Sequence, residues 1–182
     1  PLHLARFTIR DFHAENRWLS VPEIFMHSSN IGAAKMALDL GGDRQQAFLA
    51  SFGLLSPAPV ALPEIGAPMT PARWRDINTA TIGFGHGIAV SPLQLASAAT
   101  GLVNGGTMRP PTLLLRNAPT PGVRVINPET SRRMRQLLRL AVKHGTGRKA
   151  DVEGYLVGGK TGTAEKNSPE GYDRDRLLSS FL

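Results

Sequence analysis

Cysteine is absent from this 182-residue chain. Its absence excludes disulfides, thiolate catalysis and zinc sites with cysteine ligands, although a core of this size can fold in an oxidising compartment without disulfides. Long apolar runs are missing as well, since no stretch approaches the roughly 18 residues that a membrane-spanning helix needs. The first residues, PLHLARFTIRDFH, do not form an export signal of the charged-then-apolar kind. We therefore expect this piece to be soluble, and any membrane anchor to lie elsewhere in a longer protein.

Aromatic residues are scarce, at 6% of the chain, and none interleaves with its most basic stretch, residues 124–149. That stretch holds eight basic side chains against one acid, Glu129. A basic stretch can attract nucleic acid or another anionic polymer, but single-strand binding calls for aromatic stacking platforms. We interpret the stretch as a solvated helix face and expect no nucleic-acid partner. The five histidines show no ligand spacing, and we expect neither a metal nor a cofactor.

Capping and turn residues predict where the helices begin and end. Ser20, followed by Pro22 and Glu23, has the pattern of a capping box, which starts a short helix reaching about His27. Further helices are expected from about Asn30 to Gly41, from a cap at Asp43 to Phe52, from Ser91 to Gly105 and from Asn127 to His144. Strands are expected over 7–12, 155–164 and 177–182, and an irregular path over 56–71.

Two short segments carry groups suited to chemistry, Ser28-Ser29-Asn30 at a helix start and Lys160-Thr161-Gly162-Thr163 on a strand. Each is weak alone, because Ser-x-Asn before a helix is usually a cap and Lys-Thr-Gly is a short, common pattern. Residues 154–161 also fit the G-x-x-x-x-G-K-[ST] pattern of a phosphate-binding loop. That loop needs an apolar strand before it and a helix after it, and neither is expected here, so a nucleotide site is disfavoured.

A family resemblance rests on three segments in this order: SSNIGAAKMALDLG, ATIGFGHGIAVSPLQLASAAT and GGKTGTAEK. Together they resemble class B penicillin-binding proteins, the monofunctional D,D-transpeptidases of peptidoglycan synthesis, whose S-x-x-K, S-x-N and K-T-G motifs the serine β-lactamases share. Residues 74–100 look most like the cell-division, or septal, type. The resemblance implies an α+β fold in which a five-stranded antiparallel sheet packs between helices. Residues 1–182 would form a partial transpeptidase domain, with the sheet incomplete.

The resemblance also implies a role for each motif residue. Ser28 would bridge the lysine of S-x-x-K to the leaving group, and the amide of Asn30 would hold a peptide carbonyl. Lys160 would tune this relay and attract the carboxylate of a D-Ala-D-Ala terminus or of a β-lactam. The backbone N–H of Thr163 would form half of an oxyanion hole. Further substrate contacts are implied for Ser29, Thr161 and Gly162.

The S-x-x-K motif itself is not found, since no serine in the chain has a lysine three residues later. We therefore expect a fragment without the nucleophile and the final strands, inactive alone, from an intact protein that is an enzyme. Two alternatives stay open: a non-catalytic penicillin-binding-like scaffold or sensor module, and a serine β-lactamase relative. The resemblance implies division-complex partners, including a membrane glycosyltransferase. It also implies a place at the periplasmic face of the bacterial inner membrane.

Overall fold

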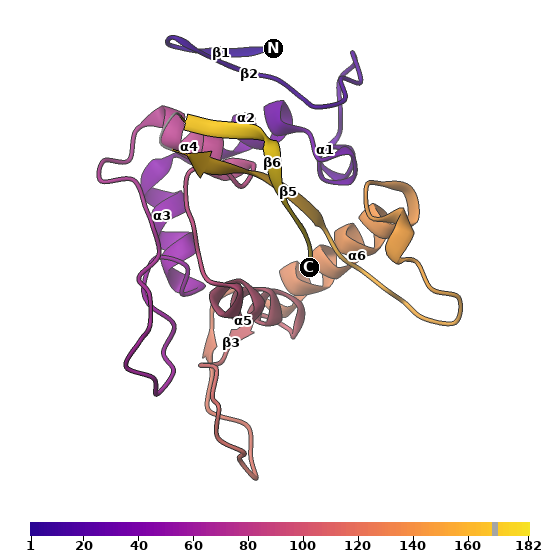
Figure 1. Ribbon diagram of the computed structural model, residues 1–182. Helices are drawn as coiled ribbons and strands as arrows, with labels where there is room; N and C mark the ends of the chain where they lie inside the picture. Colours follow the sequence, from indigo (N-terminus) through magenta and orange to yellow (C-terminus); the bar gives the residue numbers. More distant parts are fainter. Residues whose placement is uncertain (169–170) are drawn as a thin grey trace.

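The computed structural model describes residues 1–168 and 171–182, and Figure 1 shows a helical assembly crossed by a hairpin of two strands. The chain begins with the short strands β1 (Leu2–Leu4) and β2 (Phe7–Ile9). The helices are α1 (Val21–His27), α2 (Asn30–Leu40), α3 (Gly42–Ser51), α4 (Asp76–Gly83), α5 (Pro92–Val103) and α6 (Pro128–His144), with a 3-10 turn at Arg148–Ala150. The remaining strands are β3 (Thr107–Met108), β4 (Val123–Arg124), β5 (Thr161–Ser168) and β6 (Gly171–Phe181).

The centre of the helical part lies where α2 and α4 pack against each other. Ala34 of α2 and Ala80 of α4 are fully buried, and with Ile9 of β2 they form a small apolar core. The two helices approach closely because small residues face each other, so that a Cβ on Gly83 would lie 2.6 Å from the Cβ of Ala37. Larger side chains at these positions would force the helices apart.

A second packing region joins α6 to α1 and α5. The Asn127 side chain caps α6 by accepting a hydrogen bond from the backbone N–H of Thr130 at 2.7 Å. Ser131 is fully buried, and its Oγ accepts from the backbone N–H of Gly105 at 3.0 Å, just beyond α5. Val142, near the other end of α6, is also fully buried. The helix α6 therefore ties the part of the chain around α5 to the part around α1.

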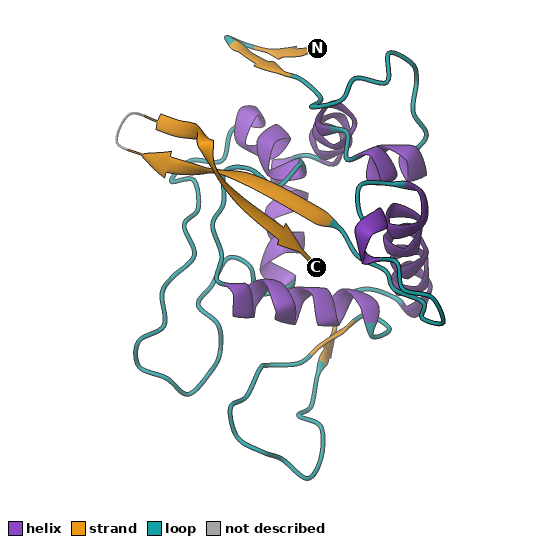
Figure 2. Ribbon diagram, turned by 45° about the vertical axis from the view of Figure 1, so that its right-hand side comes forward, coloured by secondary structure: helices purple, strands orange, loops and turns teal. Residues whose placement is uncertain are grey.

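In the described residues the strands form three separate two-stranded antiparallel sheets. The longest is the C-terminal hairpin β5–β6, in which Thr161 lies opposite Phe181 and Thr163 opposite Ser179. Figure 2 shows this hairpin passing across the helices rather than lying apart from them. Helices combined with small antiparallel sheets confirm the predicted α+β class.

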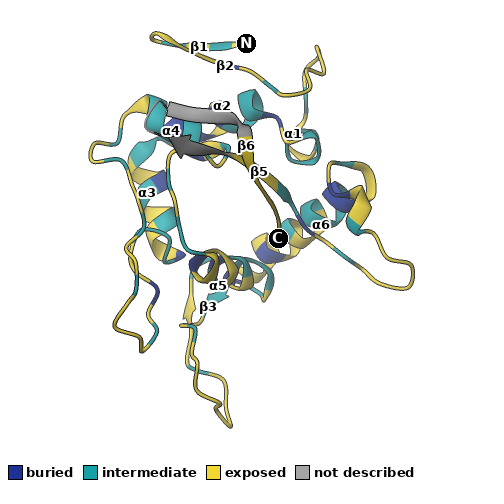
Figure 3. Cartoon of the chain, in the orientation of Figure 1, coloured by how far each residue is buried: buried dark blue, intermediate teal, exposed yellow. Residues whose placement is uncertain are grey.

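Several boundaries agree with the capping analysis. α1 begins after Ser20 with the predicted capping box, and α5 and α6 begin after the caps Ser91 and Asn127. Residues 56–71 contain no helix or strand, as predicted, apart from a single bridge between Met69 and Ala89. Figure 3 shows that exposed residues dominate the long loops, whereas the buried positions gather mostly on the helices.

Other boundaries were predicted wrongly. The cap of α3 is Gly41, because the helix starts at Gly42 and leaves Asp43 in its first turn. The strand expected over 155–164 begins only at Thr161, and the one expected over 7–12 ends at Ile9. Helix α4 and the strands β1, β3 and β4 were not predicted at all. No helix in the described part of the chain is both long enough and apolar enough to cross a bilayer.

Candidate active site

The first motif lies at the junction of α1 and α2. Ser28 ends α1 with a left-handed backbone, φ 57° and ψ 46°, a conformation that costs a residue with a Cβ roughly 1 kcal/mol. The turn is held by two backbone bonds, from Ser28 N–H to the carbonyl of Phe25 at 3.4 Å and from Ser29 N–H to that of Ile24 at 3.0 Å. The turn leaves the Ser28 residue exposed at the end of the helix.

The neighbouring motif residues Ser29 and Asn30 point in other directions. Ser29 is buried and caps α2, since its Oγ accepts from the backbone N–H of Gly32 at 3.0 Å. The same hydroxyl donates to both carboxylate oxygens of Asp11, at 3.0 and 3.1 Å. Asn30 is half-buried, and its Nδ2 donates to the backbone carbonyl of Arg10 at 3.0 Å. Both side chains are therefore tied to the N-terminal segment.

The second motif meets the first through Lys160. Its Nζ donates a hydrogen bond to Ser28 Oγ at 2.8 Å and another to the backbone carbonyl of Thr161 at 3.0 Å. Its backbone pairs with Leu182 through bonds of 2.8 and 3.1 Å, which continues the ladder of the hairpin by one residue. Partial burial lowers the pKa of Lys160 from its ordinary value, because the charged ammonium loses hydration there.

Gly159 brings Lys160 to this place. Its backbone N–H donates to the carbonyl of Leu138 on α6 at 3.1 Å, so the strand begins against the helix. The residue is buried, and a Cβ there would lie only 2.2 Å from the Phe181 ring and 2.6 Å from the carbonyl oxygen of Leu182. Only glycine fits this approach, which fixes the position from which the lysine side chain starts.

The remaining residues of the second motif follow along β5. The hydroxyl oxygens of Thr161 and Thr146 lie 2.6 Å apart in a hydrogen bond. Gly162 and Thr163 are exposed, and the Gly162 carbonyl accepts from Ser180 Oγ of the paired strand at 3.4 Å. Of the predicted site residues, the structure thus brings Ser28 and Lys160 into direct contact. It places Ser29 and Asn30 at the start of α2 and residues 161–163 at the start of β5.

Two neighbours of the site were missed by the sequence analysis. Asp11 falls in a segment that we had predicted as strand, where a lone acid carries no signal. Thr146 stands between Gly145 and Gly147 directly after α6, and a threonine flanked by glycines at a helix end is a signal that could have been used. The phosphate-binding-loop alternative fails, because Thr161 opens a strand where that loop requires a helix.

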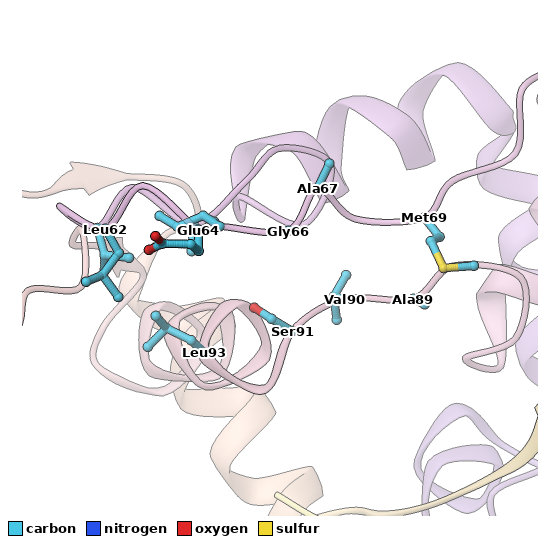
Figure 4. Close-up of a pocket in the computed structure, with 12 residues that line it drawn as sticks. Leu62, Glu64, Gly66, Ala67, Met69, Ala89, Val90, Ser91 and Leu93 are labelled. Atoms are coloured by element: carbon cyan, nitrogen blue, oxygen red, sulfur yellow. The ribbon is translucent and has the colours of Figure 1, made fainter.

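A separate apolar groove runs between the loop 58–69 and the segment 89–93. Figure 4 shows Leu62, Met69 and Leu93 among the side chains that line it. None of the predicted site residues lines this groove. We place the candidate active site at Ser28 and Lys160, because that cluster holds the groups able to move a proton. Among the described residues, no three histidine or acidic side chains gather in a way that could hold a metal.

Comparison with known families settles which one the chain matches. The family described as penicillin binding protein transpeptidase domain matches residues 3–181. The chain belongs to this family. The predicted family is therefore confirmed, and with it the fold class.

Three relatives of this transpeptidase family show how far the likeness extends. The chain is 44% identical over its whole length to a probable peptidoglycan D,D-transpeptidase FtsI of Caulobacter vibrioides, of which it covers 32%. Among solved structures, the transpeptidase domain of Burkholderia pseudomallei penicillin-binding protein 3 is 37% identical. It has a TM-score of 0.84, with 90% of this chain and 51% of that one covered. Penicillin-binding protein 3 of Mycobacterium tuberculosis in complex with aztreonam is 28% identical. Its TM-score is 0.82, with 89% of this chain and 41% of that one covered.

The coverage of these penicillin-binding relatives sets the extent of the match. The chain spans about a third of the length of the Caulobacter relative and about half of the Burkholderia domain. The residues that match the family, 3–181, run from the N-terminal strands through the S-x-N and K-T-G motifs to the hairpin.

Proposed function

We propose that the chain is the S-x-N and K-T-G part of a peptidoglycan D,D-transpeptidase that cross-links stem peptides during cell division. The observation that carries the proposal is the 2.8 Å hydrogen bond from Lys160 Nζ to Ser28 Oγ, which joins the two motifs across 132 residues of sequence. The 44% identity with a probable peptidoglycan D,D-transpeptidase FtsI of Caulobacter vibrioides supports this activity. Residues 1–182 are then a partial transpeptidase domain, to which an S-x-x-K segment outside this chain contributes the nucleophile.

In the proposed reaction a serine Oγ attacks the carbonyl carbon of the D-Ala-D-Ala bond. The new C–O bond forms, the C–N bond breaks, and D-alanine leaves as an amine after gaining a proton. An amine from a neighbouring peptidoglycan strand then attacks the ester carbonyl; the new C–N bond forms, the C–O bond to the serine breaks, and a proton from the attacking amine passes to the serine oxygen. With a β-lactam the C–N bond that opens belongs to the lactam ring, so the leaving amine stays attached and the adduct persists.

Ser28 is placed to deliver the proton. Because Lys160 donates to Ser28 Oγ, the hydroxyl proton of Ser28 is free to point towards a leaving nitrogen. The positive charge of Lys160 favours the transient alkoxide character that Ser28 develops during this transfer, and it attracts the substrate carboxylate. The hydroxyl of Thr161, held by Thr146, is a second donor for that carboxylate.

Asn30, Gly162 and Thr163 complete the proposed substrate cradle. The Asn30 amide has two N–H donors, and one of them is used by the Arg10 carbonyl, so the other remains for a peptide carbonyl. Thr163 lies on the exposed hairpin, where its backbone N–H would supply half of the oxyanion hole. Gly162 presents no side chain to a substrate that lies along the strand. Ser29, which is buried, contributes through the position of its neighbours.

The intact enzyme is proposed to work at the periplasmic face of the inner membrane, with division-complex proteins that include a membrane glycosyltransferase. The test measures intact mass, with and without a penicillin, for two proteins. One is the wild type that includes an S-x-x-K segment, and the other is the 182-residue chain. We expect a stable adduct on the longer protein only. No adduct on a folded longer protein would favour the scaffold or sensor alternative, and an adduct that is rapidly hydrolysed would favour a β-lactamase.

The same experiment has a residue-level form. Replacing Lys160→Ala should lower the rate of acylation at least about 100-fold, because both the proton relay and the attraction of the carboxylate are lost. Lys149→Ala is the matched control, since that lysine is exposed and belongs to the basic stretch. Equal rates for the two variants would contradict the role of Lys160.

A further inference from the structure

Asp11 holds the S-x-N motif from outside it. Its carboxylate accepts from the Ser29 hydroxyl at 3.0 and 3.1 Å and from the backbone N–H of Ile31 at 2.9 Å. One residue earlier, the backbone carbonyl of Arg10 accepts from Asn30 Nδ2 at 3.0 Å. Two consecutive residues of the N-terminal segment thus bind three consecutive residues at the start of α2. We call these contacts the Asp11 clasp.

The charge of Asp11 matches what α2 lacks. A helix N-terminus carries unsatisfied N–H groups and a partial positive charge, and an acid in the first turn normally balances both. The first turn of α2 contains no acid, so the carboxylate of Asp11 supplies that charge from a distant segment. Asp11 is half-buried, where bonds to a charged acceptor are stronger than those between neutral groups.

The segment that carries Asp11 is itself fastened to α1. Arg17 Nη1 forms an ion pair with Glu23 Oε1 at 2.8 Å, and Glu15 Oε1 lies 3.1 Å from His27 Nδ1. These contacts run along α1 as far as the residue before Ser28. The N-terminal segment is therefore bound both to α1 and, through the Asp11 clasp, to the first turn of α2.

The consequence falls on Ser28. Its left-handed backbone conformation is unfavourable for a serine, so neighbouring contacts must maintain it. We propose that Asp11 is a positioning residue of the transpeptidase: by holding Ser29 and Ile31 it keeps Ser28 Oγ within hydrogen-bond distance of Lys160 Nζ. This inference rests on the proposed function and adds a residue that neither motif contains.

The test uses the full-length enzyme and a fluorescent penicillin. The initial binding constant and the first-order acylation rate constant are measured separately for wild type, Asp11→Ala and Asp11→Asn. Asp11→Ala should lower the acylation rate constant about 10- to 100-fold, because a small displacement of a proton-relay group is costly. Asp11→Asn keeps one acceptor oxygen and should lose only roughly threefold. The initial binding constant should change little in both.

A double-mutant cycle separates positioning from general weakening. In a Ser28→Ala background the further loss caused by Asp11→Ala should shrink to less than about twofold, because the group that Asp11 positions is already gone. Asp43→Asn is the matched control: it removes an exposed acid in the first turn of α3 rather than one that holds α2, and acylation should stay within about twofold. Multiplicative losses in the cycle would overturn the proposal.

Hydrogen exchange gives a readout that does not depend on acylation. The amides of residues 29–32 should exchange at least about tenfold faster in Asp11→Ala, while those of α6 should not change. If the wild type is acylated and the Asp11→Ala variant is acylated equally fast, the positioning role of Asp11 is overturned and the proposed function stands. A folded wild type that takes no penicillin would overturn the proposed function. Unchanged exchange at residues 29–32 would then overturn the clasp as well.

Discussion

Ser28 stands on the helical region, which we define as α1, α2, α4 and α6, whereas Lys160 precedes the hairpin β5–β6. The helical region is held by buried side chains and by capped helix ends. The hairpin instead leaves Leu177, Leu178 and Phe181 about half exposed, and a two-stranded hairpin is marginally stable by itself. Its described hydrogen bonds to the rest of the chain include those of Thr161 with Thr146 and of Lys160 with Ser28, and the preceding Gly159 donates to Leu138 of α6. The integrity of the site thus depends on how the hairpin docks, more than on how well the helices pack.

The strongest way to break this docking is at Gly159. Gly159→Ala would place a Cβ against Phe181 and the Leu182 carbonyl. Because the chain must shift to relieve that overlap, the free energy needed to open the hairpin should fall by about 3 kcal/mol. Hydrogen exchange would show faster exchange along β5 and β6 and unchanged exchange in α2 and α4. Gly66→Ala is the control, because open space surrounds that glycine. Equal effects in helices and hairpin would contradict the comparison.

A smaller but global loss is expected from the helical region. Val142→Ala empties part of a fully buried site on α6 and should lower the free energy of unfolding by roughly 2 kcal/mol. Leu178→Ala on the hairpin, where the residue is 60% exposed, should change it by less than about 0.5 kcal/mol. Urea unfolding followed by circular dichroism measures both. A larger loss for Leu178→Ala would show that the hairpin, rather than the helices, carries the stability.

The smallest expected effect is a pH dependence in the helical region. The backbone N–H and hydroxyl of Ser20, with help from Arg17, lower the pKa of Glu23 from 4.5 to about 2. A lowered pKa means that the contribution of this carboxylate to stability is complete above pH 4.5 and is lost as the pH falls towards 2. Glu23→Gln should therefore flatten the fall in stability over that window, measured by urea unfolding at several pH values. An unchanged slope would contradict the assignment.

The sequence was most informative where a local rule sufficed. Ser20, Ser91 and Asn127 are capping residues by chemistry, and each begins a helix in the structure. Helix α4 was missed because its cap position holds Arg75, a residue that capping rules do not favour. In addition, its two threonines and its terminal Gly83 have low helix propensity. That helix is stabilised by its close approach to α2, which no local pattern reveals.

In the candidate site too, local sequence patterns predicted some features, and others depend on contacts between distant residues. The motifs around Ser28 and Lys160 were found from the sequence, but their contact could only come from the fold, because 132 residues separate them. The strand over 155–164 was placed too early, since Gly158 and Gly159 approach α6 instead of continuing the strand. Asp11 was missed because it acts on a motif residue 18 positions away, and a lone acid carries no long-range signal. Thr146 has the local signal of its flanking glycines, but that signal does not indicate Thr161 as its partner.

The separation between Ser28 and Lys160 also has a kinetic meaning. Their contact closes a loop of 132 residues. Closing a loop lowers the entropy of the chain before the contacts that it permits can contribute favourable free energy. The helix pair α2–α4 and the hairpin β5–β6 are far more local in sequence, so they can form early. The proton-relay pair should consequently be among the last contacts of the described chain to form during folding, after synthesis has reached the hairpin, and among the first to open.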